Sequence, residues 1–495
     1  MTDSISNHSD LPQGWEIVQL QDIGKIVSGG TPSTKVSEYW GDEICWISPA
    51  DLSGYTYKYI SKGNKSISRI GLENSSAKLM PKGSILFSSR APIGYVAIAS
   101  NSLATNQGFK SLVPHDNIFN EYVYYYLKSA KQLAEKQANG TTFKELSAKA
   151  FARLPIPLPP LPEQHRIVEK IEELFSELDS GVASLKKALE QLKTYRQAVL
   201  KWAFEGKLTE KWRNTHQDTL EDADTLLEQI KTERERHYQQ QLEDWKQALK
   251  DWETNGKETK KPTKPQQPKD LPPLTKEELS TLPSLPDGWC WVKVDYLLSL
   301  DKKGMTTGPF GILLKKSEHQ ISGIPVLGIE NIGNGVFLPK NKIFITEKKA
   351  RELSSFEVSG GDIIISRSGT VGEICLVPDY FGYSLISTNL IRISLNKNII
   401  IPKFFVFLFL GGGSVREQVK ELCKGSTRDF LNQTILQTII FPFPSLQEQT
   451  QIVQEIESRL SICDKLEATL SENLEKAEAL RQSILKRAFE GKLVL

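Results

Sequence analysis

The sequence predicts an α+β protein in which two mixed α/β domains are joined by two long helices that form an antiparallel coiled coil. An internal duplication predicts the two domains, since the segment from Gly140 to Leu208 returns from Gly425 to Leu493. The offset is constant, because 425 − 140 and 493 − 208 both give 285. This period far exceeds the roughly 20 to 50 residues of a solenoid repeat, so each copy can have its own core.

The front of each copy is related more loosely than its back. LPQGW at 11–15 answers LPDGW at 285–289 with an offset of 274, and Gly83 answers Gly361 with an offset of 278. The rising offset indicates several small insertions. Divergence of this kind is tolerated in surface loops, which also carry recognition when a rigid scaffold holds them.

The first domain is predicted at residues 1–153 and the second at 285–438. Short β-rich runs separated by glycine and proline predict strands in the first domain at 16–20, 84–89 and 94–99. A helix is predicted near 120–137, from the sequence EYVYYYLKSAKQLAEKQ. The domains are therefore expected to be mixtures of short strands, turns and a few helices.

A proline-rich segment follows each domain. LPIPLPPLP at 154–162 can be neither a helix nor a central strand, because its prolines lack N–H donors and fix φ. It predicts a stiff extended strap that leads out of the first domain into a helix at 163–204. A continuous helix of this length would measure about 60 Å at ~1.5 Å per residue. Strap and helix together occupy 154–208, and their second copy occupies 439–495.

Apolar residues recur in both helices, mostly at three- and four-residue spacing. In the first helix they are Ile167, Ile171, Leu174, Leu178, Leu185, Leu189, Leu192 and Val199. In the second they are Val453, Ile456, Leu460, Cys463, Leu466, Leu470, Leu474, Ala477 and Ile484. Each stripe requires an apolar partner, so the two helices are predicted to pack on each other. Gly181 interrupts the first stripe, and parallel or intermolecular pairing remains an alternative.

A distinct insert, residues 209–284, separates the two copies. Residues 209–254 predict a charged and mostly exposed helix, and 256–276 form a Pro/Lys linker. The lysines of the linker are interpreted as parts of a solvated tether.

The composition is that of a globular protein, with 39% apolar and 25% charged residues in 495. The apolar run at 401–410 is about half of the ~20 residues that a membrane span requires, and no secretory signal is predicted. Five scattered cysteines without a CxxC pair favour reduced thiols, a cytoplasmic location and no structural zinc. A net charge of +2 does not indicate nucleic acid, although basic residues can still gather on one face.

No catalytic motif is found. The GK pairs at 206–207, 256–257 and 491–492 lack the upstream glycine and the Ser or Thr of a P-loop. HExxH, GxSxG, GxGxxG and an Asn-Pro-Pro-aromatic tetrapeptide are absent from the sequence as well. Binding is therefore favoured over catalysis, and neither a catalytic residue nor a metal site is predicted.

Three pairs of motifs recur in the same order in both copies: LP-x-GW at 11–15 and 285–289, LPEQHRIV at 161–168 with LQEQTQIV at 446–453, and AFEGKL at 203–208 and 488–493. This order resembles that of the specificity subunit of type I restriction-modification systems. The match covers nearly the whole chain and includes its duplication.

The resemblance implies two target-recognition domains, each reading one half of a split, asymmetric site in double-stranded DNA. It implies a coiled coil that spaces these domains and docks two modification subunits, which bind S-adenosylmethionine and methylate adenine N6. Two restriction subunits, which use ATP and Mg, can join the complex. The chain itself would be non-catalytic and would hold no cofactor. The alternatives are a coiled-coil scaffold that does not bind DNA and a single-chain DNA-modifying enzyme.

Candidate DNA contacts are small turn residues together with polar and basic side chains, because backbone N–H groups suit phosphates and bidentate side chains suit base edges. In the first domain they are Ser28, Gly29, Gly30, Thr31, Arg90, Asn106, Gln107, Lys110, Thr141, Thr142 and Lys144. In the second they are Thr306, Thr307, Gly308, Arg367, Ser368, Thr388, Asn389, Lys424, Ser426, Thr427 and Arg428. The alternative is that the glycine-rich segments are only turns and that Asn106 and Asn389 cap strands.

Candidate partner contacts are the two AFEGKL segments, whose identity exceeds what a coiled-coil seam requires. They comprise Ala203, Phe204, Glu205, Gly206, Lys207, Leu208, Ala488, Phe489, Glu490, Gly491, Lys492 and Leu493. The alternative is helix-end architecture, since Gly206 and Gly491 would stop the helices in either case.

Overall fold

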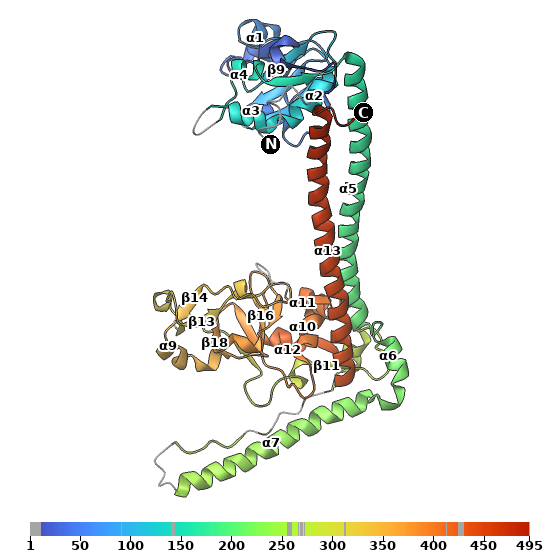
Figure 1. Ribbon diagram of the computed structural model, residues 1–495. Helices are drawn as coiled ribbons and strands as arrows, with labels where there is room; N and C mark the ends of the chain where they lie inside the picture. Colours follow the sequence, from blue (N-terminus) through green and yellow to red (C-terminus); the bar gives the residue numbers. More distant parts are fainter. Residues whose placement is uncertain are drawn as a thin grey trace. The chain divides into compact units, whose positions relative to one another are not determined.

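The computed structural model describes residues 11–90, 92–139, 144–254, 260–265, 267, 271, 273–310, 313–411, 413–423 and 430–494 (Figure 1). The chain divides into two compact units, the first formed by residues 1–188 with 469–495 and the second by 189–468. Both long helices pass from one unit to the other. The sequence-based division at residues 153, 208, 284 and 438 follows motifs rather than contacts, and it stays a prediction.

The described residues of the first unit form three sheets. The largest has the order β2-β9-β6-β7-β4, the second the order β5-β3-β8, and β1 pairs with β10. The strands are β1 Glu16–Gln19, β2 Gly24–Ser28, β3 Trp40–Ile47, β4 Tyr59–Ile60, β5 Lys65–Ile67, β6 Ile85–Ser89, β7 Ile93–Ala99, β8 Ala104–Thr105, β9 Lys110–Pro114 and β10 Pro155–Leu158. The three strands predicted from the sequence are confirmed as β1, β6 and β7.

Short helices pack on the sheets of this unit. They are α1 Arg69–Glu73, α2 Asn120–Ser129, α3 Lys131–Gln137 and α4 Ala148–Ala152. Helices α2, α3 and α4 pack on the largest sheet, and α1 packs on β3 of the second sheet. The single helix predicted near 120–137 is therefore two helices that meet at Ala130. Helix α2 buries the side chain of Tyr122 completely, in one apolar core with Phe87 and Phe151.

The proline-rich strap is an edge strand. Residues 155–158 form β10, which pairs antiparallel with β1 in a two-stranded sheet, so the expectation of an extended segment that is neither a helix nor a central strand is confirmed for them. It is wrong for Leu161 and Pro162, which are the first two residues of α5. Prolines at alternate positions leave the intervening N–H groups on the side that faces β1. The carbonyl groups of Pro155 and Pro157 accept hydrogen bonds from the hydroxyls of Tyr126 and Tyr122. The strap is therefore fixed to its own domain on both sides.

The second unit repeats this plan. Its main sheet has the order β12-β19-β16-β17, its second sheet the order β14-β13-β18-β15, and β11 pairs with β20. The strands are β11 Cys290–Lys293, β12 Met305–Thr307, β13 Ile324–Leu327, β14 Ile343–Ile345, β15 Glu357–Val358, β16 Ile363–Ser366, β17 Ile374–Leu376, β18 Ser384–Ile386, β19 Leu390–Ile393 and β20 Ile440–Phe443. In both units the second sheet contains one parallel pair, β3 with β8 and β13 with β18.

The helices of the second unit include the insert. They are α6 Glu210–Thr215, α7 Ala223–Thr254, α8 Lys276–Ser280, α9 Glu347–Glu352, α10 Pro402–Gly411, α11 Gly413–Leu422 and α12 Gln433–Thr438. Most of α7 is exposed or partly exposed, as predicted, but Leu226 and Ile230 are buried in the core of this unit. The insert is thus anchored at its start.

The two long helices are α5 Leu161–Phe204 and α13 Leu446–Phe489, each of 44 residues. In the first unit the start of α5, around Ile167, shares a core with the end of α13, around Phe489, while Asp179 pairs with Arg481. The two segments therefore run antiparallel there.

The same helices are also antiparallel in the second unit. Phe204, at the end of α5, shares a core with Ile452, near the start of α13, and Arg196 pairs with Asp464 at 2.6 Å. Leu466, which the predicted stripe included, is instead exposed.

The thiol of Cys375 provides a test of the second core. Cys375 lies on β17 with none of its surface exposed, and burial raises the pKa of its thiol to about 12. Only a thiolate reacts readily with iodoacetamide, so we expect Cys375 to stay unmodified in the native chain at pH 8 and to react in urea. Peptide mass spectrometry after timed alkylation measures this, with the partly exposed Cys45 as the internal comparison. Equal labelling of both cysteines would contradict the packing.

Candidate nucleic-acid interface

In the first domain, β2 and β6 end, and β9 begins, on the same side of the main sheet, and we call this side, where the strand ends meet, the edge. Ser28, the last residue of β2, is paired with Lys110, the first residue of β9. Ser88 near the end of β6 bridges to Phe109, and Arg90 bridges to Glu145. Six predicted residues therefore lie at or next to this edge: Ser28, Arg90, Asn106, Gln107, Lys110 and Lys144.

Gly29 and Gly30 do not present free N–H groups at this edge, as the sequence-based prediction required. Gly29 N–H donates to the carbonyl of Phe109 at 3.2 Å, and Gly30 N–H donates to that of Thr105 at 2.8 Å. A Cβ on Gly29 would lie 1.8 Å from the Asn106 carbonyl oxygen. Both residues are glycines because the backbones approach closely, so the interpretation as phosphate-binding N–H groups is wrong for them.

The loop before β9 is a turn held by its own side chains. Asn106 Oδ1 accepts from the N–H of Gly108 at 2.8 Å, an Asx turn that supports the alternative reading of this residue. Gln107 is exposed, and its side chain meets the hydroxyl of Thr31. Thr31 and Gln107 are thus brought together, and Gln107 is the one placed to face a ligand.

The charges at this edge share one carboxylate. Glu145 Oε2 lies 3.6 Å from Arg90 Nη1, and Glu145 Oε1 lies 3.7 Å from Lys110 Nζ. Lys110 is otherwise buried, whereas 38% of the Arg90 side chain is exposed. The sequence did not single out Glu145, because its contact with Arg90 spans 55 residues, from 90 to 145, without any periodic signal. Arg90 is therefore held in place and remains accessible.

The second domain has the corresponding edge. Gly308, which follows β12, donates its N–H to Leu390 at the start of β19, and Ser366 at the end of β16 pairs with that same residue. A Cβ on Gly308 would lie 1.9 Å from the carbonyl oxygen of Ser387, which repeats the close approach at Gly29. Thr388 and Asn389 are exposed here, and Ser368 donates to Asn389 Oδ1 at 3.0 Å.

Arg367 is not an exposed base reader in this structure. Its residue is 9% exposed, and its guanidinium lies 4.8 Å from the ring centre of Phe310 and 4.3 Å from that of Phe430. Loss of solvent lowers the pKa of this guanidinium. The ring sandwich buries the group that the sequence-based prediction placed at the DNA.

Two threonines of the second domain serve the fold. Thr306 is 3% exposed, and its hydroxyl accepts from Arg392 at 3.2 Å. Thr307 accepts from Gln433 at 2.8 Å. The prediction that Thr306 presents an exposed side chain to DNA is therefore wrong in this structure. Six other predicted residues lie outside the described residues: Thr141, Thr142, Lys424, Ser426, Thr427 and Arg428.

Arg90 supplies a test of the first edge. Arg90→Ala is expected to weaken binding of duplex DNA that contains the specific site by about 10-fold or more, because a good arginine-to-base contact contributes roughly 1 to 3 kcal/mol. A fluorescence anisotropy titration at fixed salt measures it. Arg153→Ala, which removes an equal charge away from this edge, is the matched control. Equal losses for both variants would indicate only a general charge effect.

The repeated motifs join each domain to a long helix. Trp15 Nε1 donates to Glu163 at 3.1 Å, and Trp289 Nε1 donates to Glu448 at 2.9 Å. The adjacent glutamines repeat a second contact, since Gln164 accepts from the N–H of Phe119 and Gln449 accepts from the N–H of Ile401, both at 2.9 Å. The LP-x-GW and EQ motifs thus hold each domain on the first turn of its helix.

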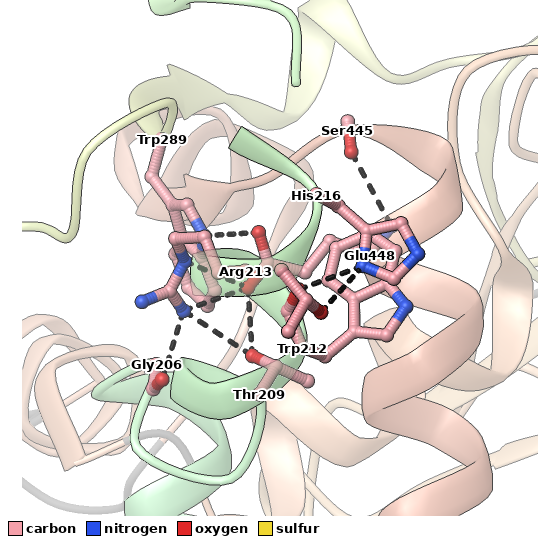
Figure 2. A network of polar contacts seen from close by, with 9 residues as sticks. Gly206, Thr209, Trp212, Arg213, His216, Trp289, Ser445 and Glu448 are labelled. Carbon is pink, nitrogen blue, oxygen red and sulfur yellow. Dashed lines mark hydrogen bonds and ion pairs between the residues drawn. The ribbon is translucent and has the colours of Figure 1, made fainter. Parts of the chain in front are cut away.

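In the second unit, Glu448 is the centre of a buried network, which Figure 2 shows. Its carboxylate accepts from the Thr209 hydroxyl at 2.6 Å and from Arg213 Nη2 at 2.7 Å, in addition to Trp289. Arg213 Nη2 also donates to the Gly206 carbonyl at 2.8 Å. Glu448 is 1% exposed, so an ion pair without solvent closes the junction of α5, α6 and α13.

The AFEGKL segments are largely helix-end architecture. Ala203, Phe204, Ala488 and Phe489 are buried in the cores, so the prediction that they contact a partner is wrong for their side chains. The remaining motif residues, Glu205, Gly206, Lys207, Leu208, Glu490, Gly491, Lys492 and Leu493, stay predictions for partner contact.

Each motif glycine terminates its helix in the same way. Gly206 has φ +70° and donates to Ala203, and Lys207 donates to Trp202. Gly491 has the same φ, and Lys492 donates to Arg487 in the same pattern, a Schellman motif.

Within the described ranges, no three His, Cys, Asp or Glu side chains come together to hold a metal ion. No helix of the described part is both long enough and apolar enough to cross a membrane.

Comparison with known proteins decides the family. Residues 12–191 and 311–476 match the model described as the type I restriction modification DNA specificity domain. The chain belongs to the type I restriction-modification DNA specificity family. The matched residues include most of both globular domains and much of α5 and α13. The resemblance stated from the repeated motifs is therefore confirmed.

Curated specificity subunits resemble this chain at different lengths. The MjaIX specificity subunit of Methanocaldococcus jannaschii is 42% identical over 184 residues, which are 37% of this chain and 42% of that protein. The EcoKI specificity subunit of Escherichia coli K12 is 23% identical over 511 residues, covering 98% of this chain and 90% of that protein.

Solved structures support the fold. One, from work on complex assembly and conformational transition of a type I restriction-modification system, has a TM-score of 0.62 at 18% identity and covers 97% of this chain and 99% of its own. The HsdS subunit from Thermoanaerobacter tengcongensis has a TM-score of 0.56, also at 18% identity, and covers 99% of this chain and 100% of its own. As a member of this family, the chain has a role in DNA recognition.

Proposed function

We propose that each globular domain of this specificity chain reads one half of a split, asymmetric DNA sequence. The observation that carries the proposal is that the edge occurs in both domains. In each domain, a glycine turn and the loop before β9 or β19 lie at the corresponding edge of that domain's own main sheet. A shared scaffold edge with different loops is the arrangement expected of two readers with different targets.

The exposed groups at the two edges suit DNA. Arg90 and Gln107 in the first domain and Asn389 in the second carry side chains that form bidentate contacts with base edges. Ser28 and Ser368 supply hydroxyls that suit phosphate oxygens. With Arg367 buried, the second domain relies more on Thr388 and Asn389 for direct contacts.

Helices α5 and α13 are proposed to form one antiparallel coiled coil that fixes the distance between the half-sites. The antiparallel contacts in each unit and the apolar stripes support it. A stiff spacer raises the effective concentration of the second domain once the first is bound, and it sets the gap in the recognised sequence.

Catalysis is proposed to reside in partner subunits. Two modification subunits would bind S-adenosylmethionine and methylate adenine N6, and two restriction subunits would add ATP- and Mg-dependent cleavage. The target adenine must leave the base stack for methylation, so both domains have to hold the flanking backbone. The chain itself would supply only recognition and positioning.

The test is a methylome. The gene would be introduced, together with that of its modification subunit, into a host that lacks both, and single-molecule sequencing would be used to find methylated adenines. We expect one new split motif with a fixed gap. With both proteins shown to be present and the modification subunit active with another specificity chain, no new methylation would overturn the proposal and favour a scaffold. Saturable S-adenosylmethionine binding by the purified chain alone would instead favour an enzyme.

A further inference from the structure

The two copies of the EQ motif differ in one respect. Glu448 accepts from Trp289 and from Arg213, whereas Glu163 accepts from Trp15 and forms no ion pair within the described residues. Glu163 is partly exposed, and Glu448 is buried. The same indole and carboxylate are therefore present twice, and a guanidinium completes the arrangement in the second unit alone.

The atoms around Gly206 and Gly491 show which space the Arg213 guanidinium occupies in the second unit and what lies at the equivalent position in the first. A Cβ on Gly206 would lie 2.3 Å from Pro286 and 2.7 Å from Arg213 Nη2. A Cβ on Gly491 would lie 2.2 Å from Pro12, and the three nearest atoms all belong to that proline, the third at 3.7 Å. The helix end and the LP-x-GW turn thus meet in the same way in both units, and no described atom of the first unit takes the place of Arg213.

Within the described part of the first unit, no arginine forms an ion pair with Glu163 or lies at this place. Residues 1–10 contain neither arginine nor lysine, and neither does the segment 140–143. A second copy of this chain is a poor source, because its Arg213 is already buried against its own Glu448.

We propose that Trp15, Glu163 and the backbone at Gly491 form an arginine acceptor for a protein partner, filled in the second unit by the chain's own Arg213. This rests on the proposed function, since the partner would be a subunit of the same complex. The partner segment would place an arginine against the Glu163 carboxylate and the Trp15 ring, as Arg213 lies against Glu448 and 5.7 Å from the Trp289 ring centre. Arginine suits the site better than lysine, because its planar fork can reach a carboxylate and a backbone carbonyl at once.

The consequence is an unequal pair of docking places. One partner copy would bind at the first unit through this arginine, and the other would meet a junction that the insert has already closed. We expect Glu163→Gln to weaken binding of one of two modification subunits by at least 10-fold. Native mass spectrometry would show one bound subunit at a concentration where the unsubstituted chain binds two. Glu169→Gln, which removes an exposed carboxylate from the same helix, is the matched control and should bind two.

A graft tests the site independently of the partner. Residues 209–216 are placed after Leu493 in the full chain, in place of Val494 and Leu495. The graft is expected to fill the acceptor, to raise the Tm of the first unit by about 3 °C, and to block one modification subunit. The same graft with alanine at the position of Arg213 should have none of these effects.

The outcomes separate the two proposals. Two bound subunits with Glu163→Gln, or equal losses with Glu169→Gln, would overturn the arginine acceptor while leaving the specificity role intact. A graft without effect on Tm would also overturn it. If the unsubstituted chain bound no modification subunit and directed no methylation, both proposals would fail.

Discussion

Arg213→Ala is expected to lower the free energy of unfolding of the unit at 189–468 by about 3 to 5 kcal/mol, the usual cost when one partner of a buried ion pair is removed. Glu448 would keep the Trp289 and Thr209 hydrogen bonds, but its charge would be left in a site that excludes water. Urea unfolding followed by hydrogen exchange of the peptides of each unit measures the effect. The first unit should keep its stability.

Two further variants test whether the unpaired charge of Glu448 causes this loss of stability. Lys211→Ala removes an exposed positive charge two residues away and should change stability by less than about 0.5 kcal/mol. The double variant Arg213→Met with Glu448→Gln removes both charges and should lose less than Arg213→Ala alone. A double variant as unstable as the sum of its parts would show that packing, and not the charge, determines the loss.

Gly29→Ala is expected to abolish recognition through the first domain. The new Cβ would lie 1.8 Å from the Asn106 carbonyl oxygen, so the loop that carries Asn106 and Gln107 would have to move. Overpacking of this kind costs about 1 to 3 kcal/mol of stability. Since two half-sites are bound together, we expect affinity for the complete site to fall by 10-fold or more.

The control for this variant is Gly41→Ala. Gly41 lies on β3 of the same unit, and the nearest atom to its Cβ would be 3.6 Å away, an ordinary contact. Duplexes with only one half-site intact would show that Gly29→Ala leaves binding through the second domain unchanged. Loss of binding to both half-sites would indicate global unfolding rather than a local displacement.

The long helices and the glycines that end them could be predicted from the sequence. The stripes and the proline-rich segment predicted a helix at 163–204, and α5 begins two residues earlier, at Leu161. The helix stops at Gly206 and Gly491 were predicted because a left-handed residue after a helix is a local signal. Periodicity and glycine act over a few residues, and a single sequence shows them directly.

The contacts that define the candidate site could not be predicted in this way. Arg213 meets Glu448 across 235 residues, and Arg90 meets Glu145 across a sheet edge. Arg367 was chosen for its residue type, yet two phenylalanine rings bury its guanidinium. Pairings of this kind depend on how distant segments pack in the folded chain. They produce no periodic pattern in the sequence from which they could be recognised.

The contacts of Pro12 with Gly491 and of Pro286 with Gly206 explain why the duplication is uneven. Each globular domain is closed by the helix end that belongs to the other half of the gene, so a change in either motif must suit a segment encoded far away. The loops that lie between the LP-x-GW motif and the strap do not take part in these contacts. Recombination could therefore replace one set of recognition loops with another and leave the closure intact, which provides a new DNA target in a single genetic event.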